Sequence, residues 1–324
     1  MARRTRRLSL PTRHPATRVV ALGGGHGLSA TLSALRHLRT EITAVVTVAD
    51  NGGSSGRLRD ELGVLPPGDL RQALAALCGD DEWGSTWARV LQHRFSSEGE
   101  LHGHAVGNLL MVAIWDLLGD HVDGLDLVGE LLGARGRVLP MSAVPLDITA
   151  EILLPGDTAP TRVRGQSEVA STDGTVLSVA LDPHDPPGCP EAVEAVLTAD
   201  WVTVGPGSWF TSVLPNLLVP ELSDALHATS ARRAVVLNLA EQPGETSGFS
   251  AAKHLEVLAE HAPDLRLDVV LADHRVVDDR VALDTAAAAL GAEVTVANLA
   301  VTDGTPRHDP LRLAGAFEQI LKQA

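Results

Sequence analysis

A glycine-rich loop between a predicted strand and a predicted helix limits this chain to a small set of folds. The apolar run 18–22 leads directly into five loop residues: Gly23, Gly24, Gly25, His26 and Gly27. Leucines at helical spacing follow up to residue 38, and a β-branched run covers 42–49. Together these segments predict a βαβ unit of about thirty residues, whose two strands are parallel and joined by a right-handed crossover.

The rest of the chain continues the alternation of strands and helices. Residues 69–132 show helical patterns, and strands are predicted at 201–204, 234–238, 267–271 and 294–297, with helices at 219–230, 250–261 and 311–321. Short alternating stretches in 137–185 indicate a small antiparallel insert. The sequence therefore predicts a Rossmann-like α/β fold with a mainly parallel sheet, helices on both faces and this insert. We expect one domain over 18–324, preceded by a basic tail, 1–17.

Charge and composition narrow the function classes. The tail carries arginines without an acid and is read either as a disordered segment or as a contact for nucleic acid or membrane. The whole chain has a formal charge of −15, which argues against nucleic acid as a bulk partner. No apolar run is long enough for a membrane span. The two cysteines, Cys78 and Cys189, lie far apart, which fits a reducing, cytoplasmic location.

The first glycine loop is expected to hold phosphate. Glycines let backbone N–H groups approach an anion, and the following helix N-terminus adds partial positive charge. Asp50 ends the second strand, where a dinucleotide-binding fold places its ribose acid. The alternative is that the glycines serve tight packing. His26 is interpreted as a loop-shaping or ligand-facing side chain rather than a base.

A second polar turn follows the second strand. It contains Asn51, Gly52, Gly53, Ser54 and Ser55 and is expected to form another anion-binding turn. Arg57 and Arg71 follow it and are predicted to contact phosphate, unless they form surface ion pairs with Asp60, Glu61 and Asp69. Asp50 and Asp69 would suit Mg²⁺ if they converge; otherwise they are solvated or capping aspartates.

The second half of the chain supplies further loops of the same kind. A glycine turn follows the strand at 201–204 and comprises Gly205, Pro206, Gly207 and Ser208, and Asn238 ends the next strand. Asn108 and Arg137 are additional candidate ligand contacts. His102 and His104 stand two residues apart, a spacing that does not favour zinc on a helix. Because ligands of open α/β sheets bind at the carboxyl edge, these loops are expected to converge on one site.

Taken together, long motifs of this sequence resemble the YvcK-like gluconeogenesis factor family. The resemblance covers about residues 18–315 and runs through 23–28 (Gly-Gly-Gly-His-Gly-Leu), 50–63, 65–71, 103–110, 135–140, 205–208 and 242–246. This family is related to CofD, the 2-phospho-L-lactate transferase of a deazaflavin cofactor pathway. From the first of these motifs Leu28 is carried over, together with Gly23, Gly24, Gly25, His26 and Gly27, as a ligand-binding residue.

The resemblance implies a cytoplasmic regulator of cell shape and cell-wall synthesis during growth on gluconeogenic carbon sources. It implies binding of a UDP-sugar such as UDP-N-acetylglucosamine, with Mg²⁺ as a further expectation, and a contribution from Arg307 in the segment 307–309. A homodimer and cell-wall synthesis proteins are the partners it suggests. No nucleophile–base pair is evident, so catalytic residues are left unassigned and a non-enzymatic role is favoured.

Several residues depart from the family pattern, and alternative functions therefore stay open. His26 stands where relatives usually have threonine, and Asn51 where many have a second aspartate, which weakens a CofD-like metal site. Glu241 replaces a common threonine, and the chain has no tyrosine to stack on a uridine. The alternative functions are a CofD-like transferase acting on a deazaflavin and, less favoured, an NAD(P)-binding oxidoreductase.

Overall fold

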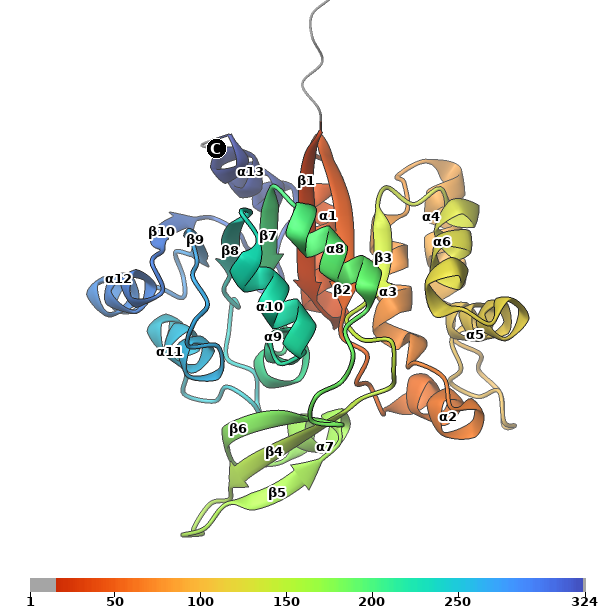
Figure 1. Cartoon of the computed structure of the whole chain (residues 1–324), viewed down its shortest axis with the longest axis horizontal. Coiled ribbons are helices and arrows are strands. Elements are labelled where there is room, and N and C mark those ends of the chain that lie inside the picture. Colours follow the sequence, from red (N-terminus) through yellow and green to blue (C-terminus); the bar gives the residue numbers. More distant parts are fainter. Residues whose placement is uncertain (1–15, 323–324) are drawn as a thin grey trace, which may run out of the picture.

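A seven-stranded parallel sheet forms the centre of the molecule. The computed structural model describes residues 16–322, and the strands follow the order β10-β9-β8-β7-β1-β2-β3, with every neighbouring pair parallel (Figure 1). Their bounds are β1 (Thr17–Gly23), β2 (Thr40–Val46), β3 (Arg137–Pro140), β7 (Trp201–Val204), β8 (Arg232–Val236), β9 (Val269–Asp273) and β10 (Glu293–Ala297). The predicted tail, 1–17, lies almost wholly outside the described residues, since β1 begins at Thr17.

Helices cover both faces of the sheet. One face carries α1 (Gly25–Leu35), which contacts α3 (Pro67–Leu77) and α13 (Pro310–Leu321). The other face carries α8 (Pro190–Thr198) and α10 (Pro220–Ala228), which cross in front of the strands in Figure 1. Further helices are α4 (Glu82–Gln92), α5 (Val106–Leu118), α6 (His121–Leu132), α11 (Ala251–His261) and α12 (Arg280–Ala289). The predicted parallel sheet with helices on both faces is confirmed.

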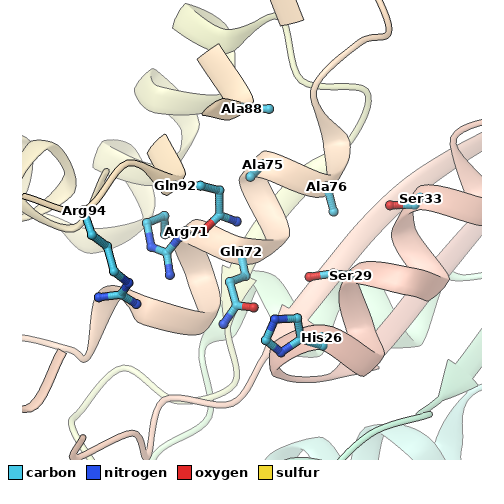
Figure 2. Close-up of a pocket in the computed structure, with 10 residues that line it drawn as sticks. All are labelled: His26, Ser29, Ser33, Arg71, Gln72, Ala75, Ala76, Ala88, Gln92 and Arg94. Atoms are coloured by element: carbon cyan, nitrogen blue, oxygen red, sulfur yellow. Dashed lines mark hydrogen bonds between the residues drawn. The ribbon is translucent and has the colours of Figure 1, made fainter. Parts of the chain in front are cut away.

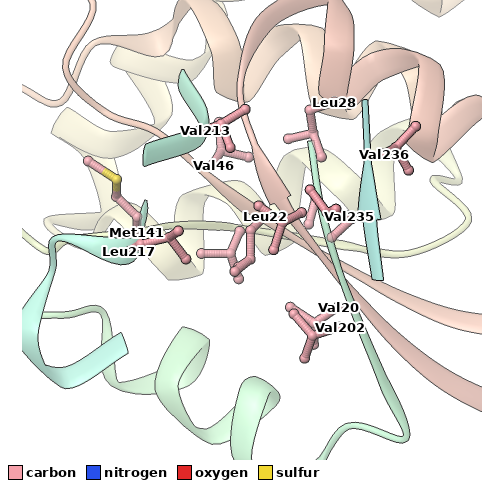
Figure 3. Packing of buried hydrophobic residues seen from close by; sticks show 14 of the residues in the cluster. Val20, Leu22, Leu28, Val46, Met141, Val202, Val213, Leu217, Val235 and Val236 are labelled. Atoms are coloured by element: carbon pink, nitrogen blue, oxygen red, sulfur yellow. The ribbon is translucent and has the colours of Figure 1, made fainter. Parts of the chain in front are cut away.

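Side chains of adjacent strands form the core between these layers. Val20 and Leu22 of β1 lie beside Val202 of β7 and Val235 of β8, and each is at most 2% exposed (Figure 3). Because a parallel sheet is buried on both faces, its strands are almost continuously apolar rather than alternating. This explains why short apolar runs ending in glycine were sufficient to predict them.

The predicted antiparallel insert is present below the carboxyl edge of the main sheet (Figure 1). It consists of β4 (Asp147–Leu153), β5 (Thr161–Arg164), α7 (Gln166–Ser171) and β6 (Thr175–Asp182), in the strand order β5-β4-β6. The insert begins later than the predicted residue 137, because β3 is the parallel edge strand of the main sheet. Arg59 fastens the insert to the body through a 2.7 Å ion pair with Asp147.

Two segments differ from the sequence prediction. The polar turn after β2 is short, because Gly53 already opens a helix, α2 (Gly53–Leu62). That helix buries its small polar first turn, and a Cβ on Gly56 would overlap the carbonyl of Asn51. After β7 the chain forms a π-helical turn, Trp209–Val213, and a short α9 (Leu214–Leu217), where only a loop was expected.

Candidate functional site

The order in which successive strands are added to the sheet reverses between the neighbouring parallel strands β1 and β7. From β1 the chain proceeds to β2 and β3 on one side, whereas β7, β8, β9 and β10 follow one another on the other side. The loops after β1 and β7 therefore flank the switch point, where open α/β sheets bind their ligands. These loops contain the two most glycine-rich of the predicted ligand segments, 23–27 and 205–208.

The two loops pack backbone against backbone. A Cβ on Gly27 would overlap the carbonyl oxygen of Pro206 and lie 2.5 Å from the Cα of Gly207. Asn238, at the end of β8, holds Gly207 from the other side: its Oδ1 accepts from the Gly207 N–H at 2.8 Å, and its Nδ2 donates to the Gly207 carbonyl at 2.8 Å. For Gly27, the tight-packing interpretation therefore holds. Asn238 positions the second loop rather than presenting a free amide.

The Asp69 carboxylate lies against the first glycine loop. Helix α1 has no side-chain cap of its own at Gly24. Asp69 Oδ1 accepts a hydrogen bond from Gln72 Nε2 at 3.2 Å. A Cβ on Gly24 would lie 2.5 Å from Asp69 Oδ2, so glycine is needed there for this close approach.

The charge of Asp50 acts on Asp69. Asp69 is 9% exposed, and burial, followed by the charge of Asp50, raises its pKa to about 7. Asp50 itself accepts from the Gly52 N–H at 2.9 Å. A role of the two carboxylates in holding Mg²⁺, which takes one or two carboxylates and completes its shell with waters, stays a prediction. No cluster of three or more metal-binding side chains occurs in residues 16–322.

Helix α7 of the insert forms a wall of the site. The amide of Asn51 holds it by two bonds, accepting from the Ser167 N–H at 3.0 Å and donating to Glu168 Oε2 at 2.7 Å. Gln166 donates to the Thr211 carbonyl at 3.1 Å on the opposite side. An aspartate at position 51 would accept the first bond and repel Glu168, so the departure at Asn51 is matched to this contact.

A buried polar network lies behind the turn at 51–55, which follows β2. Arg71 Nε donates to Asn108 Oδ1 at 2.8 Å, and Asn108 Nδ2 donates to Ser54 Oγ at 3.0 Å. The same Oγ accepts from the Ala105 N–H, which leaves its own proton for His104 Nδ1 at 3.1 Å. This requires His104 to be neutral at Nδ1, and burial accordingly lowers the pKa of His104. Ser54 and Asn108 thus act inside the network.

Two contiguous cavities lie at this edge of the sheet. A polar cavity of about 330 Å³ lies between the glycine loops, Asp69 and α7. A second cavity of about 500 Å³, called here the Arg307 cavity, extends from Gly27 and Gly207 past Asn238 to the turn at 306–310. His26 and Gln242 line both. Arg307 lies in the outer wall, where it pairs with Asp303 at 2.8 Å.

Three predicted contacts lie elsewhere, and their assignment is corrected. Arg57, on α2, donates to the carbonyls of Glu100 and His102 and therefore points away from the cavities. Arg137 opens β3 at the amino edge of the sheet, on the far side from the loops, and pairs with Asp126 at 2.7 Å. Leu28 is 1% exposed and packs in the core rather than toward a ligand (Figure 3).

The other predicted residues either line the cavities or hold the lining loops in place. Gly23 and Gly25 have positive φ values of 155° and 56° and shape the first loop. Gly52 is the N-cap of α2, Gly53 is its first residue, and Ser55 is buried in its first turn. Ser208 bonds to Thr211 and to the buried Glu245. The wall residues of the polar cavity that were not among the predicted contacts are Gln72, Gln166, Ser167, Ala170, Thr211, Ser212 and Gln242.

The fold and the paired glycine loops define the class: a Rossmann-like α/β protein with a polar ligand cleft at its switch point. The family model described as 2-phospho-L-lactate transferase CofD matches residues 19–301, and the chain belongs to this family. Within it, the chain groups with proteins named gluconeogenesis factor, as the sequence motifs predicted.

The similarity to these relatives extends over most of each chain. A Mycobacterium tuberculosis protein named "Putative gluconeogenesis factor" is 53% identical over 307 residues, which cover 93% of this chain and 90% of the relative. The Halalkalibacterium halodurans gluconeogenesis factor is 40% identical, over 81% of this chain and 79% of its own. A crystal structure of a UPF0052 family member from Bacillus halodurans superposes with a TM-score of 0.84 at 34% identity, covering 94% of this chain and 99% of that one.

Proposed function

We propose that this chain is a gluconeogenesis factor that binds a nucleotide sugar of the UDP-N-acetylglucosamine type in the cleft at the switch point. The observation that carries the proposal is the position of Arg307. It lines the same cavity as Gly27 and Gly207, so the glycine loops and the Arg307 guanidinium belong to one ligand-sized space. An arginine opposite glycine-loop amides is suited to a diphosphate.

The two cavities divide such a ligand into parts. The diphosphate would lie at the glycine loops, where the cavities join. The nucleoside would extend into the Arg307 cavity, whose wall includes Leu239, Pro306 and Pro310. The sugar would enter the polar cavity under α7, where Gln166 and Ser167 offer hydrogen-bonding groups. This division suits an asymmetric nucleotide diphosphate with a polar second end.

The absence of an evident nucleophile–base pair in the cleft, within the described residues, favours a binding role over catalysis. His26, the histidine common to both cavities, has no carboxylate partner among the ion pairs of residues 16–322. Regulation of cell shape and cell-wall synthesis, in the cytoplasm, is the role we infer from the family resemblance. No helix in the described part of the chain is long and apolar enough to cross a membrane.

A CofD-like transferase is the second candidate, and the charge of Asp50 acting on the buried Asp69 favours it. Mg²⁺ held by these carboxylates would neutralise the charge of a diphosphate, which is the chemistry that a transfer from a diphosphate ester needs. Asp69 would support the first glycine loop at Gly24, and α7 would shield the polar cavity from water.

Calorimetric titration with UDP-N-acetylglucosamine, UDP-glucose, NADP and a deazaflavin, each with and without Mg²⁺, tests both candidates. We expect selective binding of a UDP-sugar that is recovered unaltered after incubation. A ligand at 100 times its Kd should add about 2.7 kcal/mol to the free energy of unfolding, so a thermal shift will accompany binding. Binding of the deazaflavin only with Mg²⁺, and none of the UDP-sugars, would select the transferase instead.

A further inference from the structure

A third cavity of about 530 Å³ lies between α1, α3 and α4, beside the Arg307 cavity. It is called here the Arg71–Arg94 pocket. Figure 2 shows Arg71, Arg94 and Gln92 together on one side of it, and His26, Ser29 and Gln72 on the other. His26, Ser29 and Ser33 line both this pocket and the Arg307 cavity, so the two are neighbours across a single helix face.

The charged side chains that line this pocket are both arginines. This is unusual in a protein of net charge −15, and no carboxylate is among the lining residues. Neither guanidinium forms an ion pair with another residue of 16–322. The nearest carboxylates that act on Arg71 are Asp69 and Asp50, which belong to the glycine-loop site. The pocket therefore has positive charge without a partner of its own.

Arg71 is a preorganised donor. It is only 3% exposed, and two of its nitrogens are held from behind, Nε by Asn108 at 2.8 Å and Nη1 by Gln92. Its Nη2 makes no hydrogen bond to the described residues. Glycine at position 107 permits this placement, since a Cβ there would lie 2.9 Å from Arg71 Cγ and Cδ. Burying an arginine and fixing its planar fork reduces the entropy lost when an anion binds.

Arg94 complements this donor from the pocket rim. It is an exposed residue, and its Nη1 donates to the Gly103 carbonyl at 2.8 Å, which orients the guanidinium. After burial, the charge of Arg94 is the second cause that lowers the pKa of Arg71, to about 10. Two guanidinium groups that repel each other in one cavity are stabilised by an anion between them.

We propose that the Arg71–Arg94 pocket is a second anion-binding subsite, distinct from the glycine loops, which takes a phosphate or carboxylate group. That group belongs either to a separate phosphorylated or carboxylated metabolite or to the far end of the ligand in the neighbouring cleft. The inference goes beyond the proposed nucleotide-sugar binding and does not depend on the identity of that nucleotide.

Inorganic phosphate, titrated by calorimetry at constant ionic strength, is the probe. We expect a phosphate-binding event that Arg94→Gln weakens by about tenfold or more, the usual effect of losing a charge-assisted contact. Arg57→Gln is the matched control, because Arg57 also donates to carbonyls of the 100–102 turn but lies outside the pocket. An equal loss in both variants, or no loss in Arg94→Gln, would overturn the proposal.

A second pair of variants tests the pocket without removing an arginine. Ala75 lines it one helical turn after Arg71 on α3, so Ala75→Glu places a tethered carboxylate within reach of that guanidinium. We expect Ala75→Glu to abolish the phosphate event and Ala75→Gln to retain it. Phosphate binding that survives in Ala75→Glu would contradict the assignment.

Repeating the titration with saturating UDP-N-acetylglucosamine distinguishes the two sources of the anion. Persistence of the Arg94-dependent event shows that the pocket takes a separate molecule, and its loss shows that the nucleotide sugar reaches it. If the nucleotide sugar does not bind at all, the titration of the free chain still decides the proposal. The proposed function would then fail while the subsite is tested independently.

Discussion

The carboxylate of Asp69 lies against Gly24, the N-cap residue of α1, where an added Cβ would lie 2.5 Å from Asp69 Oδ2. A helix N-terminus favours an anion, and here an internal anion already occupies part of that position. A diphosphate that approaches the same loop therefore meets both the remaining amides and this carboxylate. The charge state of Asp69, together with any cation beside it, controls how attractive the loop is.

Asp69→Asn tests this control. The pKa of Asp69 is raised to about 7, so wild-type protein carries a mostly neutral Asp69 below that pH and a charged one above it. In Mg²⁺-free buffer we expect the affinity for UDP-N-acetylglucosamine to fall by about tenfold as pH rises through 7, through charge repulsion. In Asp69→Asn this pH dependence should disappear. The measurement is calorimetric titration at several pH values.

Mg²⁺ provides the control for that experiment. If the cation is held by Asp50 and Asp69, adding it should remove the loss of affinity at high pH in wild-type protein and change little in Asp69→Asn. A pH dependence equally steep in the variant and in wild type would show that the titrating group lies elsewhere.

Gly27→Ala should separate the two glycine loops. The added Cβ would overlap the Pro206 carbonyl, and neither backbone can move without displacing its strand end. We expect a loss of about 1–3 kcal/mol in the free energy of unfolding, as for other overpacked sites, and weaker ligand binding. Gly315→Ala in α13, where an added Cβ meets nothing within 4 Å, is the control and should be neutral or stabilising. Chemical denaturation measures both, and equal stabilities would refute the close packing.

The sequence predicted the position of the site better than the roles of its residues. Short apolar runs that end in glycine are sufficient to find β1 and β7, because glycine marks the strand ends of a buried parallel sheet. The two loops were therefore placed correctly at one edge. Arg57 and Arg137 were wrongly assigned to the site, because a position near a glycine motif in the sequence does not determine where the side chain points. Arg57 faces outward on a helix, and Arg137 begins a strand rather than ending one.

Contacts between residues far apart in the chain could not be predicted from the sequence. The contact between Asp69 and Gly24 depends on how α3 packs against α1, and the wall that α7 forms depends on an insert that looks peripheral in sequence. Asn51 illustrates the same limit. The sequence suggests that Asn51 weakens a metal site. In the structure its amide joins the turn after β2 to Ser167 and Glu168, more than a hundred residues away.

Arg307→Gln should weaken UDP-N-acetylglucosamine binding by about tenfold and leave stability nearly unchanged. Within residues 16–322 it forms one ion pair, with the exposed Asp303 four residues away, and such pairs contribute little to stability. Arg280→Gln is the matched control, because Arg280 forms the same kind of exposed pair with Asp284 at 2.8 Å and lies outside the cavities. Calorimetry and thermal denaturation are measured on both. Similar affinities in the two variants would remove Arg307 from the ligand site.

His308, the neighbour of Arg307, should make the fold sensitive to acid. The buried Nε2 of His308 has no partner among the described residues, and burial, against the smaller opposing effects of Asp273 and the Leu237 carbonyl, lowers the pKa of His308 to about 4. The unfolded chain, with an ordinary histidine pKa near 6.5, binds this proton first as pH falls. Stability is therefore lost between pH 6.5 and 4, by up to about 3 kcal/mol.

His308→Gln keeps a donor for Leu237 and removes the titration, so denaturation midpoints measured against pH should decline less steeply in this variant. The exposed His184 supplies the control His184→Gln, which should follow wild type. Asp69 acts with the opposite sign: its raised pKa makes the fold lose stability as pH rises from 3.8 to about 7. Because the two effects overlap in pH, the test of the His308 prediction is the difference in denaturation midpoint between His308→Gln and wild type at each pH. A constant difference across this range would show that His308 has its ordinary pKa in the folded protein.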